Sequence, residues 1–155
     1  MKVRGHQLAI DAPAGWEVRI GRRVPDSGAP GALSRPVMHA ATIALPEVRG
    51  DFGGDVTGRL GTEDVFVSLF EYEPAAVGTP LFALRGRPRP GVDDFSPAGL
   101  QRSIAGQSGR QYFFQESGRA FCLYVVLGSH ARRAALIRKV REILDTLELD
   151  TAVGS

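Results

Sequence analysis

The C-terminal third of the chain constrains the fold most strongly, because an apolar strand pattern is followed directly by an amphipathic helix pattern. Residues 119–127 read RAFCLYVVL, and apolar side chains at both parities are typical of a strand covered on both faces. After Gly128 and Ser129, residues 131–147 place six apolar side chains on one stripe: Leu136, Ile137, Val140, Ile143, Leu144 and Leu147. Burying each contributes about 1.5–3 kcal/mol before conformational entropy is subtracted. We therefore expect this helix to cover a β-sheet.

The rest of the chain predicts short antiparallel strands separated by turns. The sequence contains 19 glycines and 10 prolines, which favours many turns over long helices. We expect three hairpins, formed by residues 7–10 with 16–20, 56–60 with 65–72, and 110–116 with 119–127. The predicted fold is one α+β domain over residues 1–155, with its core at about 6–149. It consists of an antiparallel β-sheet of about six to eight strands covered by the C-terminal amphipathic helix.

Two long segments rich in Arg, Pro and Gly, residues 21–36 and 85–97, are predicted to be loops. Loops of this length in a compact domain are often functional, and loops on a rigid sheet are the usual layout of a binding module. Each loop is basic at one end. The candidate partner-binding residues are Arg22, Arg23, Arg85, Arg87 and Arg89. Residues 74–84 fit a helical turn followed by a strand, because Pro80 disfavours a continuous helix.

The start of the C-terminal helix is a candidate anion site. Ser129 is predicted to cap the helix, and Arg132 and Arg133 lie in its first turn, where they oppose the helix dipole. Together with His130 and the free backbone N–H groups, they form a combination able to hold a phosphate or carboxylate. The alternative is a capped helix with solvated arginines.

Catalytic and metal-binding signatures are absent from the sequence. No GxxxxGK[ST], HExxH or CxxC pattern occurs, and we predict no metal or cofactor. A nucleophilic role for Cys122 would require a nearby histidine, His6, His39 or His130. Because Cys122 lies between Phe121 and Leu123 in an apolar run, we expect it to be a packed core residue. An enzymatic activity is therefore uncertain and less expected than a binding role.

Composition and charge restrict the class of protein. The net charge of +2 is too small to indicate nucleic acid binding, and the aromatic residues near the C-terminus are not interleaved with basic ones. Only Lys2 and Lys139 of the 19 basic residues are lysines, which suggests a GC-rich bacterial genome. One cysteine excludes an internal disulfide framework. Without an apolar leader or a run approaching ~18 apolar residues, we expect a cytoplasmic protein with no membrane insertion.

Two segments resemble the PsbP-like superfamily. These are AIDAPAGWEV at residues 9–18 and YVVLG followed by LIRKVREILDTL, which ends at residue 147. The resemblance covers about a quarter of the chain. It implies an α+β antiparallel sheet and a scaffolding or adaptor role, since members mostly bind proteins and share no catalytic set.

The favoured hypothesis is a non-enzymatic protein-binding or accessory module, adaptor or chaperone-like, that uses the two loops and a sheet edge. One alternative is a small enzyme or anionic-ligand-binding protein working at residues 128–133. Another is a homo-oligomeric structural component, because residues 65–72 and 120–127 are apolar on both faces.

Overall fold

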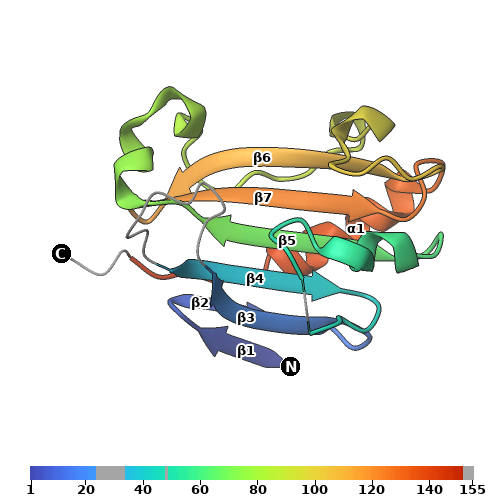
Figure 1. Cartoon of the computed structure of the whole chain (residues 1–155), viewed down its shortest axis with the longest axis horizontal. Helices are drawn as coiled ribbons and strands as arrows, with labels where there is room; N and C mark the ends of the chain where they lie inside the picture. Colours follow the sequence, from blue (N-terminus) through green and yellow to red (C-terminus); the bar gives the residue numbers. More distant parts are fainter. Residues whose placement is uncertain (24–33, 48, 152–155) are drawn as a thin grey trace.

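Two antiparallel sheets and one long helix make up the protein. The computed structural model describes residues 1–23, 34–47 and 49–151. The larger sheet has the strand order β3-β4-β5-β7-β6, and the smaller has the order β1-β2-β8 (Figure 1). The larger sheet comprises β3 (Glu17–Arg23), β4 (Arg35–Ala41), β5 (Val65–Glu71), β7 (Arg119–Leu127) and β6 (Ser108–Glu116). The smaller comprises β1 (Lys2–Gly5), β2 (Leu8–Asp11) and β8 (Glu148–Leu149).

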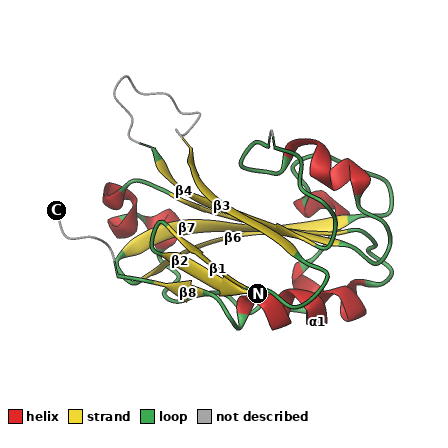
Figure 2. Cartoon of the chain, turned by 90° about the horizontal axis from the view of Figure 1, so that it is seen from below, coloured by secondary structure: helices red, strands yellow, loops and turns green. Residues whose placement is uncertain are grey.

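The C-terminal helix, α1 (Arg133–Leu144), packs against one face of the five-stranded sheet together with the small sheet (Figure 2). All six side chains of the predicted stripe are buried: Leu136, Ile137, Val140, Ile143, Leu144 and Leu147. They join one core cluster with the side chains of β5 and β7 that face them, including Val67, Leu123 and Val125. The prediction of a helix covering an antiparallel sheet is confirmed, but the helix is shorter than the predicted residues 131–147, and Leu147 is buried just after its end.

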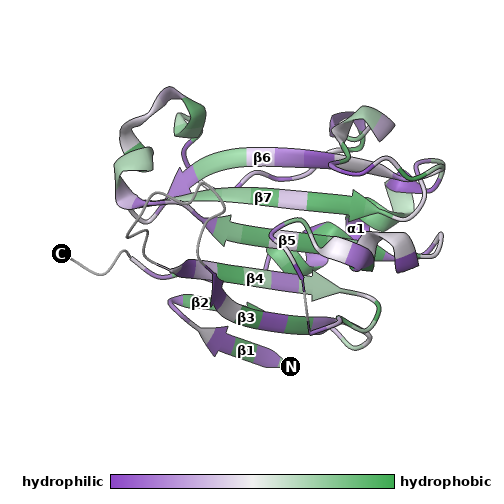
Figure 3. Cartoon of the chain, viewed as in Figure 1, coloured by the Kyte–Doolittle hydropathy of each residue, from purple (hydrophilic) through white to green (hydrophobic). Residues whose placement is uncertain are grey.

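The opposite face of the five-stranded sheet is also covered within the chain. Phe66, Tyr124 and Val126 are buried there under Leu45 and Val56, which belong to the segment between β4 and β5. A short helix in that segment, η1 (Gly54–Arg59), begins after Gly53, where a Cβ would lie 2.6 Å from the Phe66 ring. The two-sided apolar pattern of β5 and β7 therefore reflects a sheet covered on both sides, as Figure 3 shows by its apolar colouring of these strands.

Three sequence predictions need correction. The strands do not form a single sheet of six to eight, but two sheets of five and three. Residues 7–10 do not pair with 16–20. Instead β2 folds back on β1 through His6 and Gln7, whose φ values of 51° and 62° make a tight two-residue turn. Residues 56–60 lie in η1 and its end rather than in a strand, so β5 pairs with β4 and β7.

The third predicted hairpin is confirmed. β6 and β7 pair along their whole length from Ser108 with Leu127 to Glu116 with Arg119. Ser117 and Gly118 form the turn with φ values of 57° and 75°, as a primed turn requires. The ambiguous 74–84 segment forms two short helices, η2 (Pro74–Gly78) and η3 (Pro80–Phe82), and the 85–97 segment contains η4 (Val92–Asp94).

Candidate partner-binding surface

The outer edge of β6 is the feature of the fold best suited to contact a partner. Hydrogen bonds at the two ends of this edge show which backbone groups of β6 point away from β7. Gln115 donates its N–H to the Leu84 carbonyl at 2.8 Å and accepts from the Gly86 N–H at 2.7 Å. At the other end, Gly109 donates to the Ser96 carbonyl at 3.0 Å. Because the backbone groups of a strand alternate in direction, the N–H and C=O groups of the odd-numbered residues of β6 point away from β7.

The two outward-facing residues in the middle of β6 lack backbone partners. The N–H and C=O groups of Gln111 and Phe113 form no hydrogen bond with any described residue on this side. Figure 1 shows η2 and η3 above one end of β6 and the segment around η5 (Pro97–Gly99) above the other. The chain thus closes both ends of this edge and leaves its middle open.

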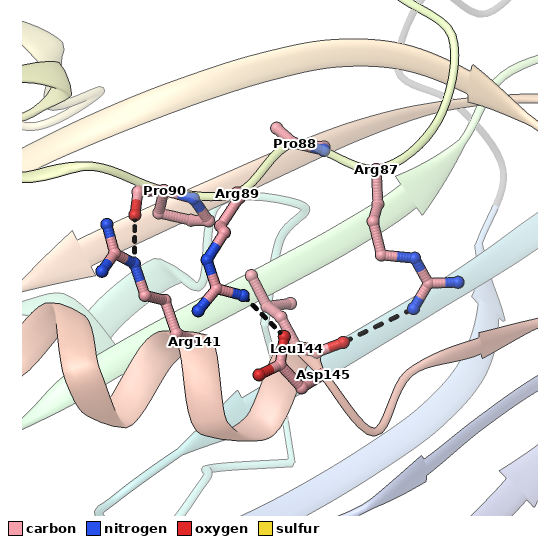
Figure 4. Close-up of a pocket in the computed structure, with 7 residues that line it drawn as sticks. All are labelled: Arg87, Pro88, Arg89, Pro90, Arg141, Leu144 and Asp145. Atoms are coloured by element: carbon pink, nitrogen blue, oxygen red, sulfur yellow. Dashed lines mark hydrogen bonds and ion pairs between the residues drawn. The ribbon is translucent and has the colours of Figure 1, made fainter.

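The segment between Gly86 and Ser96 runs away from β6 because it is bound to the C-terminal end of α1. Pro88 and Pro90 have no N–H to donate to a strand. The N–H and guanidinium of Arg87 bind the Glu116 carboxylate, and its Nη1 also donates to the Leu147 carbonyl. Arg141 of α1 donates to the Pro90 carbonyl at 2.7 Å (Figure 4). The segment therefore serves as a strap across the C-terminal end of α1.

This strap changes the interpretation of the predicted loop arginines. Arg87 is engaged within the chain, and Arg89 pairs with Asp145 at 3.1 Å. The positive charges satisfy carbonyls and a carboxylate at the C-terminal end of the helix, where cations are stabilising. Arg85 differs from both: it is exposed and forms no hydrogen bond or ion pair with a described residue.

Exposed apolar side chains gather beside the closed end of β6 near Gln115. Leu81 is 56% exposed and Leu84 is 50% exposed. The Leu84 carbonyl accepts a hydrogen bond from the Gln115 N–H, so the Leu84 backbone lies at the closed end of this edge, two residues along β6 from Phe113. On the same strand, Arg110 lies over the Tyr112 ring at 5.5 Å, and its charge acts on Asp94, the carboxylate that accepts the hydrogen bond of the Tyr112 hydroxyl. The surface therefore combines unpaired backbone groups, two exposed leucines and one cation, Arg85, that has no ion pair with a described residue.

The basic end of the 21–36 loop lies away from this edge, at the end of β3. Arg22 donates to the side chain and backbone of Ser34, while Arg23 pairs with Asp51 at 2.8 Å and stacks over Phe70. Residues 24–33, and so the middle of this predicted partner-binding loop, lie outside the described residues. Arg22 and Arg23 therefore do not form a common site with the strap.

The predicted anion site at the start of α1 is largely occupied by internal contacts. Ser129 Oγ accepts a hydrogen bond from the Arg132 N–H at 3.3 Å, but α1 begins at Arg133 with Arg132 in the N-cap position, so the predicted capping of the helix by Ser129 is wrong. Arg132 pairs with Glu63 at 2.6 Å, and Arg133 donates to the His130 carbonyl at 3.0 Å. His130 Nδ1 is a buried atom without a hydrogen-bond partner in the part of the chain that the structure describes. Ser129, His130, Arg132 and Arg133 thus lie together, but with both guanidinium groups engaged.

A second polar cluster lies between β4, β5 and the segment that covers them. Arg49 Nε donates to His39 Nδ1 at 2.8 Å, and Ser68 Oγ donates to the Asp51 carbonyl. Burial, reinforced by the Arg49 charge, lowers the pKa of His39 to about 4, so the ring is neutral at pH 7. His39 and Ser68 therefore anchor the covering segment. Ser68 gives its proton to a carbonyl rather than to a base, so the pair is not arranged as a nucleophile and its base.

Cys122 lies within the core of the same sheet. It is fully buried, and burial raises the pKa of its thiol to about 12. Among the described residues no hydrogen bond joins it to His6, His39 or His130. In the same parts of the chain, no group of three or more His, Cys, Asp or Glu side chains is placed to hold a metal ion.

The comparisons with known proteins provide no relative. No family model, no curated protein and no solved structure matches the chain. Over the described residues, no helix is both long enough and apolar enough to cross a membrane. The functional interpretation therefore depends on the residues and the geometry of this structure.

The leucines of this surface were not among the sequence-predicted site residues. A signal was present, because Leu81 and Leu84 follow Pro80 in a segment whose strand or helix assignment was ambiguous. Nothing in the sequence indicates the unpaired backbone groups of Gln111 and Phe113, because their exposure depends on the path that the strap takes in the folded protein.

Proposed function

We propose that the protein is a non-enzymatic, cytoplasmic protein-binding module of the adaptor or chaperone type, built like members of the PsbP-like superfamily. The observation that carries the proposal is the exposed pair Leu81 and Leu84 beside a sheet edge with unpaired backbone groups. Exposed apolar residues grouped at one place mark interaction sites, and open edges pair with other chains unless they are protected. The buried, neutral states of His39 and Cys122 agree with a binding role rather than a catalytic one.

A photocrosslinking amino acid at position 84, expressed in the native cell, tests this proposal. We expect discrete crosslinked products at position 84 and none from a matched position at Glu142, which is exposed on α1. Leu81→Ser in the crosslinking variant should reduce the yield. Absence of products at position 84, or equal products at both positions, would contradict a dedicated binding surface there.

A small anionic ligand at the start of α1 is a second candidate. The unpartnered His130 Nδ1 and the two adjacent arginines favour it. Binding would require Arg132 to leave Glu63. A rise in melting temperature with phosphate or a nucleotide, lost in Arg132→Ala, would support this function, and no shift with either would remove it.

The homo-oligomeric alternative was based on two strands that are apolar on both faces, and this pattern now has another explanation. The second apolar faces of β5 and β7 are covered by residues of the same chain. Light scattering that gives a mass of about 16.6 kDa for the free protein would exclude it.

A further inference from the structure

The open edge of β6 defines the kind of partner that the surface can accept. Four backbone groups, the N–H and C=O of Gln111 and of Phe113, point away from β7 without partners among the described residues. A row of alternating donors and acceptors at strand spacing matches the backbone of another extended segment. A helix satisfies its own backbone groups and offers no complementary row.

The length of the opening is limited at both ends. Leu84–Gly86 pair with Gln115, and Ser96 pairs with Gly109. The second contact is close: a Cβ on Gly99 would lie 1.9 Å from the Gly109 carbonyl oxygen. The interval from residue 109 to residue 115 spans about 20 Å at the rise of a strand. Only a short extended segment, or one that bends away at both ends, fits between these contacts.

A second copy of the chain does not meet this requirement. In an antiparallel pairing of two β6 strands about Tyr112, Gly109 of the second copy would lie opposite Gln115. That position is already taken by Leu84–Gly86, and the Ser96 segment of the second copy would collide with it. The closed ends therefore favour a free peptide segment over the edge of another copy.

The surrounding side chains indicate the composition of the segment. Leu81 and Leu84 provide an apolar contact at one end. Arg85 is an exposed cation without an ion pair to a described residue. The nearby carboxylates already have partners within the chain. Glu116 binds Arg87, and Asp94 accepts a hydrogen bond from the Tyr112 hydroxyl at 2.7 Å and interacts with the charge of Arg110. Charge complementarity thus favours acidic side chains in the partner.

Resting on the protein-binding function proposed above, we propose that β6 binds a short extended peptide segment, aliphatic and acidic in composition, as an added strand at Gln111 and Phe113. The backbone groups of the peptide pair with these two residues. An aliphatic side chain packs on Leu84, and a carboxylate pairs with Arg85.

The test begins with a displayed library of random linear octapeptides selected on the folded protein. We expect enrichment of sequences in which aliphatic and acidic residues alternate. A synthetic copy of a selected peptide should lose about tenfold or more in affinity when its backbone is N-methylated at alternate residues, since each lost backbone hydrogen bond counts. Peptides with an intact backbone should protect the amides of Gln111 and Phe113 from hydrogen exchange.

Variants of β6 provide matched controls. Gln111→Pro removes one outward N–H without touching the pairing with β7, while Gln111→Thr keeps it. We expect about tenfold weaker binding for the first and unchanged binding for the second. Arg85→Ser should reduce the preference for acidic peptides. Because Gln111→Pro can perturb folding, circular dichroism accompanies it, and the N-methylated peptide tests the same bond in the unaltered protein.

Several outcomes would overturn the inference. These are no enrichment, binding that tolerates both N-methylation and Gln111→Pro, or a dimer in light scattering that Gln111→Pro dissolves. Crosslinks at position 84 without any strand-binding peptide would retain the protein-binding function and reject strand addition. If neither crosslinks at position 84 nor a strand-binding peptide were found, both the protein-binding function and strand addition would be rejected.

Discussion

Arg119 and Glu71 form a two-point ion pair inside the protein, with Nη2 to Oε1 at 2.8 Å and Nε to Oε2 at 3.1 Å. The Arg119 side chain is 1% exposed, although it lies at the start of β7. Its remaining N–H groups donate to the carbonyls of His6, Gln7 and Asp150. One side chain therefore joins the turn of the small sheet, the C-terminal segment and the large sheet.

We expect Glu71→Ala to lower the free energy of unfolding by about 3–5 kcal/mol, because it leaves the buried Arg119 charge without its carboxylate. The matched control is Glu148→Ala, which removes two exposed pairs, with Lys2 and Arg4, and should cost less than about 1 kcal/mol. Urea unfolding of the two variants measures the difference. Equal effects would show that the Arg119 pair is no more important than a surface pair.

Acid should destabilise the protein partly through His39. Its pKa is about 4 in the folded protein and near 6.5 when unfolded. Because the unfolded state binds the proton more readily, the contribution of neutral His39 is complete above about pH 6.5 and is lost as the pH falls toward 4. Across this window wild type should lose up to about 3 kcal/mol more than His39→Asn. Urea unfolding at several pH values tests this, and parallel curves would contradict it.

The helix stripe accounts for a large part of the stability. Leu136 is fully buried in the main core, whereas Arg138, two residues later, is exposed. Leu136→Ala should therefore cost about 2–5 kcal/mol through lost burial and a cavity, and Arg138→Ala less than about 0.5 kcal/mol. Thermal and urea unfolding compare them. A small cost for Leu136→Ala would mean that α1 is not required to cover the sheet.

Arg87 distinguishes a structural strap from a partner-binding loop. We expect Arg87→Ala to destabilise the protein by about 1–3 kcal/mol, since it leaves Glu116 and carbonyls at the end of α1 without a donor. Arg89→Ala, which removes an exposed pair, should change stability by less than about 1 kcal/mol. If Arg87→Ala left stability unchanged but abolished the crosslinks at position 84, the original assignment of this arginine to partner binding would be correct.

Cys122 should react with a thiol reagent only after unfolding. Its burial and its pKa of about 12 leave almost no accessible thiolate at pH 8. We expect the rate of reaction with an aromatic disulfide reagent to be negligible in buffer and to rise with the unfolded fraction in urea. Rapid labelling of the folded protein would indicate a reactive cysteine and would reopen a catalytic interpretation.

The predictions that succeeded depend on contacts close in sequence or on strong periodicity. The stripe from Leu136 to Leu147 specifies which helix face is buried, and Ser117-Gly118 specifies the turn of the last hairpin. The predictions that failed concern pairing at a distance. Residues 56–60 have a strand-like composition, yet Gly53 packs against the Phe66 ring and the chain continues as η1.

The candidate site shows the same division. A binding role for residues near 85–97 was predicted from composition and stays a prediction, and Arg85 is exposed without an ion pair to a described residue. The sequence does not reveal that Arg87 turns inward to Glu116, because that depends on the position of the β6–β7 hairpin relative to the end of α1.

By itself, the sequence determined the apolar face of the last helix, the final hairpin and a buried cysteine, because each follows from the local alternation of apolar and polar side chains. Only the tertiary structure decided that the strands divide into two sheets, that Arg119 is buried between them, and that Gln111 and Phe113 keep an open edge. These features depend on which backbone hydrogen bonds form between residues distant in the chain, and local side-chain patterns do not specify those partners.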